Sequence, residues 1–201
     1  TALSAPSRRG DQLGDAGGAR VNAVRLPVTR PPSTRIIPMT RRHIPRAVEL
    51  EAQAYPRGWS RSVFRSELDQ VGRGGRRYLA ALEGRRLVGY AGLWVVAGTN
   101  GSEAHITNVV VDPERRRCGI ATRLLVMLAR EARESGVTGW TLEVRASATG
   151  AQELYRGFGF APAGVRKAYY EHGEDAVVMW CHSIGDDGYD DLLDHLDQGD
   201  R

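Results

Sequence analysis

Residues 109–125, VVVDPERRRCGIATRLL, constrain the fold more than any other stretch of this 201-residue chain. Three valines are typical of a buried strand, Asp112 and Pro113 end it, and the apolar repeat after Gly119 predicts an amphipathic helix. Three arginines therefore lie where a strand turns into a helix. Such a turn offers free backbone N–H groups, the positive end of a helix dipole and side-chain charge, which together bind phosphate. A solvated charged turn is the alternative.

Two well-known phosphate-binding loops are excluded at this turn. A P-loop needs Gly-Lys-Ser/Thr after a longer glycine loop, and a dinucleotide-binding fingerprint needs three glycines in GxGxxG spacing. Neither spacing occurs here.

The remaining periodicity predicts an α/β chain with a mixed sheet. Apolar alternation and short turns favour strands, and apolar residues on one helical face favour helices that Thr40 and Ser60 can cap. The predicted strands are 34–39, 78–82, 87–96, 103–111, 140–145, 165–170 and 176–182, and the predicted helices are 43–54, 61–70, 119–135 and 148–157.

The two ends of the chain differ from this central domain, residues 34–184. Residues 1–33 are rich in Gly, Pro, Ser and Arg without periodicity, which predicts a disordered extension. Residues 185–201 form an acidic tail. Leucines at positions 192, 193 and 196 have helical spacing, so a short helix and a solvated tail are both open there.

Composition narrows the class of protein. No run of eighteen apolar residues could span a bilayer, and the first residues lack the apolar core of a secretory signal, so we expect a cytoplasmic protein without membrane contact. Cys118 and Cys181 are too few for a disulfide framework, and neither they nor the five histidines have metal-ligand spacing. We expect no metal. The net charge of +4 rests almost wholly on arginine and does not predict specific nucleic-acid binding.

Several segments resemble one enzyme family. The run RRCGIA at 116–121, after Val-Asp-Pro, resembles the R/Q-x-x-G-x-G/A signature of the GNAT N-acetyltransferases. WTLEVRAS at 140–147, LYRGFGF at 154–160 and RKAYY at 166–170 are similar to the RimI branch, over about residues 34–184. The resemblance implies an α/β (α+β) three-layer fold with a mixed, mostly antiparallel sheet flanked by helices, and acetyl-CoA as co-substrate.

The same resemblance assigns roles to particular residues. Glu143 is implied as general base, through water, and Tyr155 as general acid. A backbone N–H near the end of the 103–111 strand would polarise the carbonyl. The implied cofactor contacts are Val109, Val110, Val111, Arg116, Arg117, Cys118, Gly119, Ile120, Ala121, Thr122 and Tyr155, and the implied substrate contacts are Tyr55, Trp59, Tyr169 and Tyr170.

Each role has a structural alternative. Taken alone, Glu143 is a surface residue paired with Arg145 or a neighbouring arginine, and Tyr155 is a helix residue that packs on the sheet. The four aromatic residues implied as substrate contacts, which we call the groove aromatics, are equally explained by packing. Cys118 has no histidine near it in sequence and is expected to be a loop residue rather than a nucleophile.

One position departs from the family pattern. The family has Asn after Arg-Ala-Ser, where it contacts the cofactor, and this chain has Ala148. One hydrogen bond, about 0.5–1.5 kcal/mol net, is then missing or supplied by Thr149 or by the helix N-terminus.

The leading hypothesis is an N-alpha-acetyltransferase that acts on the N-terminal residue, alanine, of a ribosomal protein, as RimI-branch members do. A GNAT enzyme that acetylates a protein lysine or a small-molecule amine is the second reading, since one fold hosts many acceptors. The third is a non-catalytic, Arg-rich RNA- or ribosome-binding module. A monomer is favoured.

Overall fold

The computed structural model describes residues 33–73, 75–98 and 101–199. The predicted extension, apart from residue 33, lies outside them. Seven strands and five α-helices form in the described part, and all of them except the sixth strand and the fifth helix lie close to the predicted boundaries. The strands are β1 (Thr34–Pro38), β2 (Arg76–Glu83), β3 (Arg86–Gly98), β4 (Gly101–Val111), β5 (Val137–Arg145), β6 (Ala161–Arg166) and β7 (Ala176–Cys181), and the helices are α1 (Ile44–Ala54), α2 (Arg61–Asp69), α3 (Ile120–Glu134), α4 (Thr149–Gly157) and α5 (Tyr189–Gly199).

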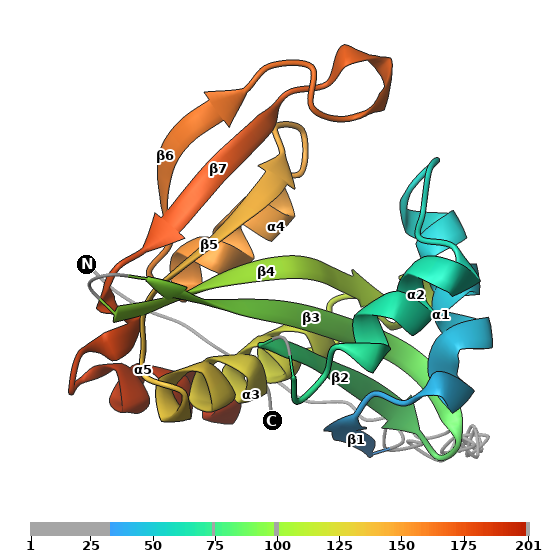
Figure 1. Cartoon of the computed structure of the whole chain (residues 1–201), viewed down its shortest axis with the longest axis horizontal. Helices are drawn as coiled ribbons and strands as arrows, with labels where there is room; N and C mark the ends of the chain where they lie inside the picture. The colour runs from blue at the N-terminus through green and yellow to red at the C-terminus, as the bar shows by residue number, and fades with distance from the viewer. Residues whose placement is uncertain (1–32, 74, 99–100, 200–201) are drawn as a thin grey trace, which may run out of the picture. The chain divides into compact units, whose positions relative to one another are not determined.

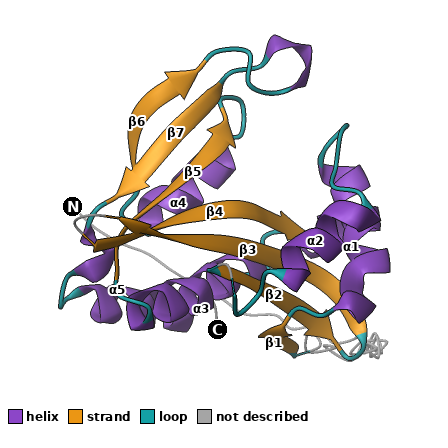
Figure 2. Ribbon diagram, viewed as in Figure 1, coloured by secondary structure: helices purple, strands orange, loops and turns teal. Residues whose placement is uncertain are grey.

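The strands form one mixed sheet in the order β1-β2-β3-β4-β5-β7-β6. Only the β4–β5 pair is parallel, and every other neighbouring pair is antiparallel. Helices cover both faces of the sheet (Figures 1 and 2). The prediction of a mixed, mostly antiparallel sheet flanked by helices is confirmed.

The alternation of side chains in β2 explains the three layers. Leu79 and Ala81 belong to the core cluster that contains the apolar faces of α3, α4 and α5. Tyr78, Ala80 and Leu82 belong to the cluster under α1 and α2. Successive side chains of a strand point to opposite faces, so a continuously apolar strand needs cover on both.

The sheet separates between β4 and β5. Their pairing ends at His105 and Thr141, although β4 continues to Val111 beside β3 and β5 continues to Arg145 beside β7. A register shift between Gly92 and Leu93 leaves Thr107 as an extra residue of β4, and such a bulge bends the strand. Figure 1 shows β5, β7 and β6 leaning away from β4 beyond this point.

One predicted strand needs correction. The strand predicted at 165–170 ends at Arg166, because Ala168 has a φ of 49° and its N–H donates to Asp175 Oδ1 at 3.0 Å. A left-handed residue takes the chain out of the extended conformation that a strand needs. Tyr169 and Tyr170 therefore lie in the β6–β7 connection.

Of the two alternatives for the acidic segment at the C-terminal end, the structure has the helix. Its helix α5 buries Tyr189 and Leu193 in the core beside α3, α4 and the sheet. On its polar face, Asp190 pairs with Arg133 at 3.0 Å and Asp194 with Arg130 at 2.7 Å. The acidic residues thus meet the arginines of α3, and the boundary predicted at residue 185 does not end the packed core.

No helix in the described part of the chain is long and apolar enough to cross a membrane.

Candidate active site

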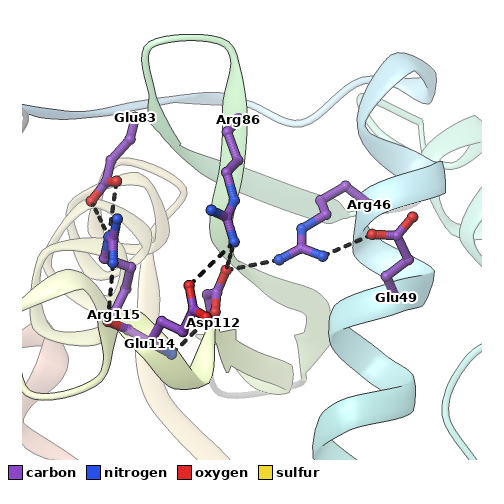
Figure 3. A network of polar contacts seen from close by, with 7 residues as sticks. All are labelled: Arg46, Glu49, Glu83, Arg86, Asp112, Glu114 and Arg115. Carbon is purple, nitrogen blue, oxygen red and sulfur yellow. Dashed lines mark hydrogen bonds and ion pairs between the residues drawn. The ribbon is translucent and has the colours of Figure 1, made fainter.

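The turn between β4 and α3 is held by a buried carboxylate. Asp112 accepts a hydrogen bond from the Glu114 N–H at 3.1 Å and pairs with Arg46 of α1 and Arg86 of β3, each at 2.8 Å (Figure 3). Burial opposes the charge of Asp112, but these hydrogen bonds and the two arginines hold its pKa below the usual range. Arg115 is held by Glu83 at 2.9 Å.

The next residues leave backbone N–H groups free. Arg117 and Gly119 have φ angles of 61° and 71°, and α3 begins at Ile120 without a side-chain cap. Arg116 and Arg117 form no ion pair with any described carboxylate. A left-handed turn that ends at an uncapped helix N-terminus is an anion-binding arrangement, so the geometry agrees with the phosphate prediction.

A cavity of about 820 Å³ opens beside this turn, and we call it the larger cavity. It contains ten of the eleven predicted cofactor contacts. Cys118 is the exception, because it is exposed and its thiol donates to the Arg116 carbonyl at 3.5 Å. The predicted residues that line the larger cavity are Val109, Val110, Val111, Arg116, Arg117, Gly119, Ile120, Ala121, Thr122 and Tyr155.

A cavity of about 220 Å³, the smaller cavity, lies next to it. All four predicted groove aromatics line the smaller cavity: Tyr55, Trp59, Tyr169 and Tyr170. The two cavities share Tyr55, Val109, Glu143, Arg145, Tyr155 and Tyr170. They therefore adjoin at the separation of β4 and β5, where Glu143 and Tyr155 contribute to both.

Tyr155 enters this junction from α4. It is buried, and its ring packs edge-on against Phe160 with 5.8 Å between centroids. Burial raises the pKa of the Tyr155 phenol, so the hydroxyl keeps its proton at neutral pH. Packing and a chemical role are compatible here, because the same ring lies against the core and lines both cavities.

Glu143 projects from β5 with a carboxylate that is 10% exposed. Its Oε1 lies 3.0 Å from Arg166 Nη2 and its Oε2 lies 3.2 Å from His105 Nε2. An arginine partner was one of the two readings of Glu143, and that partner is Arg166 rather than Arg145. With both oxygens held in this way, the carboxylate lines both cavities.

Arg145 instead supports the far side of the smaller cavity. It pairs with Glu171 at 2.9 Å and Glu174 at 2.7 Å, and its guanidinium lies 4.2 Å from the centroid of the Tyr170 ring. The Tyr170 hydroxyl donates to the Glu143 carbonyl at 3.1 Å. These contacts tie the β6–β7 connection to β5 and hold Tyr170 at the cavity.

Glu51 is a cavity residue that the sequence reasoning missed. It is 2% exposed and accepts hydrogen bonds from the Tyr90 hydroxyl, Asn108 Nδ2 at 3.3 Å and the Trp59 N–H at 3.3 Å. A signal was present, because Glu51 lies four residues after buried Ala47 on the apolar face of α1. A carboxylate at a core position indicates a buried polar role.

The larger cavity also shows which of the two alternative donors for the absent asparagine lies beside it. Ala148 is the N-cap residue of α4, makes no side-chain cap and lines the cavity. Gly150 and Ala151 from the first turn of α4 line it as well, whereas Thr149 does not. Of the two alternative donors, the helix N-terminus is the one that faces the cavity.

No group of three or more His, Cys, Asp or Glu residues suited to a metal ion occurs within residues 33–73, 75–98 and 101–199.

Comparison with known proteins identifies the family of this chain. The profile of the Acetyltransferase (GNAT) family matches residues 44–160, more than half of the chain, and the chain belongs to that family of acyltransferases. One relative of this chain is the N-alpha-acetyltransferase RimI of Mycobacterium tuberculosis, which is 37% identical over 70% of this chain and 87% of the relative. The [ribosomal protein bS18]-alanine N-acetyltransferase of Escherichia coli is 34% identical over 68% of this chain and 88% of the relative.

The fold agrees with solved structures. The crystal structure of the ribosomal-protein-S18-alanine N-acetyltransferase from Escherichia coli superposes with a TM-score of 0.63 and 29% identity, over 74% of this chain and 93% of that one.

Proposed function

We propose that this protein is an acetyl-CoA-dependent N-alpha-acetyltransferase whose acceptor is the N-terminal residue, alanine, of a ribosomal protein. The observation that carries the proposal is the position of Glu143 and Tyr155, where a cavity with an anion-binding turn meets a cavity lined by aromatic side chains. Relatives named for the alanine of bS18 support this acceptor. A ribosomal acceptor places the reaction in the cytoplasm.

The larger cavity fits acetyl-CoA by its own chemistry. The uncapped N-terminus of α3, with Arg116 and Arg117, would hold the pyrophosphate. The edge of β4 at 109–111, which has no β5 partner, would present main-chain groups to the pantetheine arm. Acetyl-CoA supplies the acetyl group as a thioester.

Glu143 and Tyr155, where the two cavities adjoin, can carry out the proton transfers that the reaction requires. An acceptor α-amine must lose a proton before its lone pair is free, and Glu143 can take that proton through water. The Tyr155 hydroxyl, kept protonated by burial, can donate a proton to the departing sulfur. A β4 backbone N–H near Val109 would stabilise the negative charge that develops on the carbonyl oxygen.

The smaller cavity fits an extended N-terminal peptide. Tyr55 and Trp59 come from the α1–α2 connection, and Tyr169 and Tyr170 come from the β6–β7 connection, so the aromatic side chains bracket the entry to Glu143. Large flat rings offer apolar contact at low cost in conformational entropy.

A peptide assay tests the proposal. The substrate is a peptide with the N-terminal sequence of bS18, beginning with alanine, and CoA release and the mass of the product are measured. The matched control is the same peptide with a blocked N-terminus and one internal lysine. We expect turnover of the first peptide only, and Glu143→Gln or Tyr155→Phe should reduce kcat by about 10²-fold or more.

The two readings separate cleanly in this assay. Acetylation of the blocked peptide at lysine would replace the proposed acceptor with a side-chain amine. Absence of turnover with every free-amine peptide would reject the proposed function. Circular dichroism of each variant distinguishes lost chemistry from lost folding.

A further inference from the structure

The smaller cavity contains a titratable side chain that the proton steps above leave unused. His105 lies on β4 at the last residue pair before β4 and β5 separate, opposite Thr141. Its ring lines the smaller cavity, and its Nε2 lies 3.2 Å from Oε2 of Glu143. The other oxygen of Glu143 is occupied by Arg166 at 3.0 Å. The arrangement is a carboxylate held between an imidazole and a guanidinium.

The surroundings keep the imidazole able to accept a proton. Burial lowers the pKa of His105 from its ordinary 6.5, and the charges of Arg166 on β6 and Arg76 on β2 lower it further. Glu143 on β5 acts in the opposite direction. On β3 the neighbour of His105 is Trp94, whose ring carries Arg76 at 4.0 Å. The net lowering of this pKa favours the neutral ring at pH 7.

We propose that His105 and Glu143 act together as the base, and that the proton taken from the acceptor amine ends on the imidazole ring of His105. This inference rests on the proposed function and refines the identity of its base. An ion-paired carboxylate beside a neutral imidazole is the arrangement that orients the ring and stabilises the imidazolium formed when the ring gains a proton.

The atoms balance with one proton accepted and one released. A carboxylate only accepts, so in this proposal the neutral ring keeps its proton on Nε2, 3.2 Å from Glu143, and Nδ1 carries the free lone pair. One N–H bond of the acceptor ammonium breaks, directly or through water, and an Nδ1–H bond forms. The freed amine lone pair forms the C–N bond, the C–S bond breaks, and the Tyr155 proton passes to sulfur.

The remaining steps restore the site. After the attack, the nitrogen carries one proton more than the amide product does. That proton returns to the Tyr155 oxygen. His105 then releases the proton it accepted to solvent, because its side chain is 32% exposed. The net change is acetylated amine, CoA thiol and one proton in solution.

His105→Gln is the decisive variant, since a glutamine amide can still donate to Glu143 but cannot titrate. We expect kcat to fall by about 10²-fold. In the wild type, kcat/KM should rise with pH through a limb below 6.5, because the ring must be neutral to accept a proton and burial lowers its pKa. That pH dependence of kcat/KM should vanish in His105→Gln. The pH dependence that comes from the acceptor amine, whose pKa is about 8, should remain.

Chemical rescue adds a second readout. His105→Ala opens a space the size of the ring, and added imidazole should restore at least about tenfold of the lost activity. His182→Gln is the matched control, because His182 stacks on Trp180 and lines neither cavity. It should keep the rate and pH profile of the wild type.

Two results would overturn the inference. One is a His105→Gln enzyme within twofold of wild type with the low-pH limb intact. The other is a normal His105→Gln enzyme beside an impaired His105→Ala enzyme that imidazole does not rescue, which would mean that the ring only positions Glu143. The assay uses whichever amine the wild type acetylates, so failure of the ribosomal peptide alone rejects the proposed acceptor and still tests His105.

Discussion

The larger cavity is lined mainly by two continuous stretches of chain, residues 109–122 and 143–155. The smaller cavity is lined by residues of α1, the α1–α2 connection, β4, β5, α4 and the β6–β7 connection. In the larger cavity the key groups are backbone N–H donors placed by local geometry at Arg117 and Gly119. In the smaller cavity they are side chains placed by buried polar contacts. Local sequence therefore encodes the first, and long-range packing builds the second.

Both cavities nevertheless have a buried carboxylate as an anchor, with partners from distant segments. Asp112 fixes the turn beside the larger cavity through arginines from two other elements. Glu51 fixes the α1–α2 connection through neutral donors, and Gly58 lies so close that a Cβ there would be 2.9 Å from the Glu51 Cβ. Asp112 supports the charged turn beside the larger cavity, and Glu51 supports the connection that carries the aromatic side chains Tyr55 and Trp59.

The largest effect is expected from Asp112→Asn. The change leaves Arg46 and Arg86 without their buried counter-charge, and because both arginines are partly exposed we expect a loss of about 2–3 kcal/mol in the free energy of unfolding at pH 7. The folded pKa of Asp112 is lowered, so its contribution is present above its unfolded pKa of about 3.9 and is lost as pH falls through the folded value.

Urea unfolding at pH 7 and at decreasing pH measures this. The difference between wild type and Asp112→Asn should shrink as the solution is acidified below about pH 4. A difference that stays constant with pH would contradict the assigned role of the charge.

Glu51→Gln tests the anchor of the smaller cavity. The new amide group faces donors on Trp59, Asn108 and Tyr90, so at least one loses its acceptor and the free energy of unfolding should fall by about 2 kcal/mol. The KM for the acceptor peptide should rise, and the KM for acetyl-CoA should stay within about twofold.

The control is Glu49→Gln on the same helix. The exposed Glu49 carboxylate pairs with Arg46, and this pair should contribute less than about 1 kcal/mol to the free energy of unfolding. A Glu51→Gln enzyme with equal changes in both KM values would show that the two sides of the site do not depend on separate anchors.

Gly119→Ala tests the larger cavity, with Gly136→Ala as its matched control. The two glycines flank α3 with φ angles of 71° and 70°, so both substitutions should cost about 1 kcal/mol of stability. Only Gly119 lines the larger cavity, so only its variant should raise the KM for acetyl-CoA, by about fivefold or more. A similar rise in KM for Gly136→Ala would assign the effect to helix strain rather than to the turn.

Ala148→Asn should give the smallest effect of these variants, and it should lower the KM for acetyl-CoA rather than raise it. The new side chain adds a donor at the N-cap of α4, facing the larger cavity. One net hydrogen bond of about 0.5–1.5 kcal/mol corresponds to a KM for acetyl-CoA that is about two to ten times lower. An unchanged KM, measured by CoA release at saturating peptide, would mean that the first turn of α4 already supplies that contact.

Most of the fold was predictable because it depends on periodicity. The apolar faces of α3 and α4 and the alternation in the strands identify the elements, and Ser60 caps α2 as predicted by accepting from the Val63 N–H at 3.4 Å. The strand predicted through Tyr170 was wrong because nothing in the local sequence shows that Ala168 takes a left-handed conformation.

The candidate site divides in the same way. The turn at 116–122 could be proposed from one contiguous motif, while the pairing of Glu143 with His105 and Arg166 could not, because these residues come from β5, β4 and β6. Glu51 was detectable only as a polar residue on an apolar helix face. The predicted catalytic and binding roles stay predictions until the variants are measured.

By itself the sequence determined the order of the elements, the amphipathic faces that produce layers on both sides of a sheet, and the positively charged turn before α3. These features depend on residues close together in the chain. The tertiary structure decided that β4 and β5 separate after His105 and Thr141, that α5 joins the core, and that Glu51, His105 and Glu143 line one cavity. Strand separation and buried polar partners arise from the packing of distant segments, and no local pattern of residues specifies that packing.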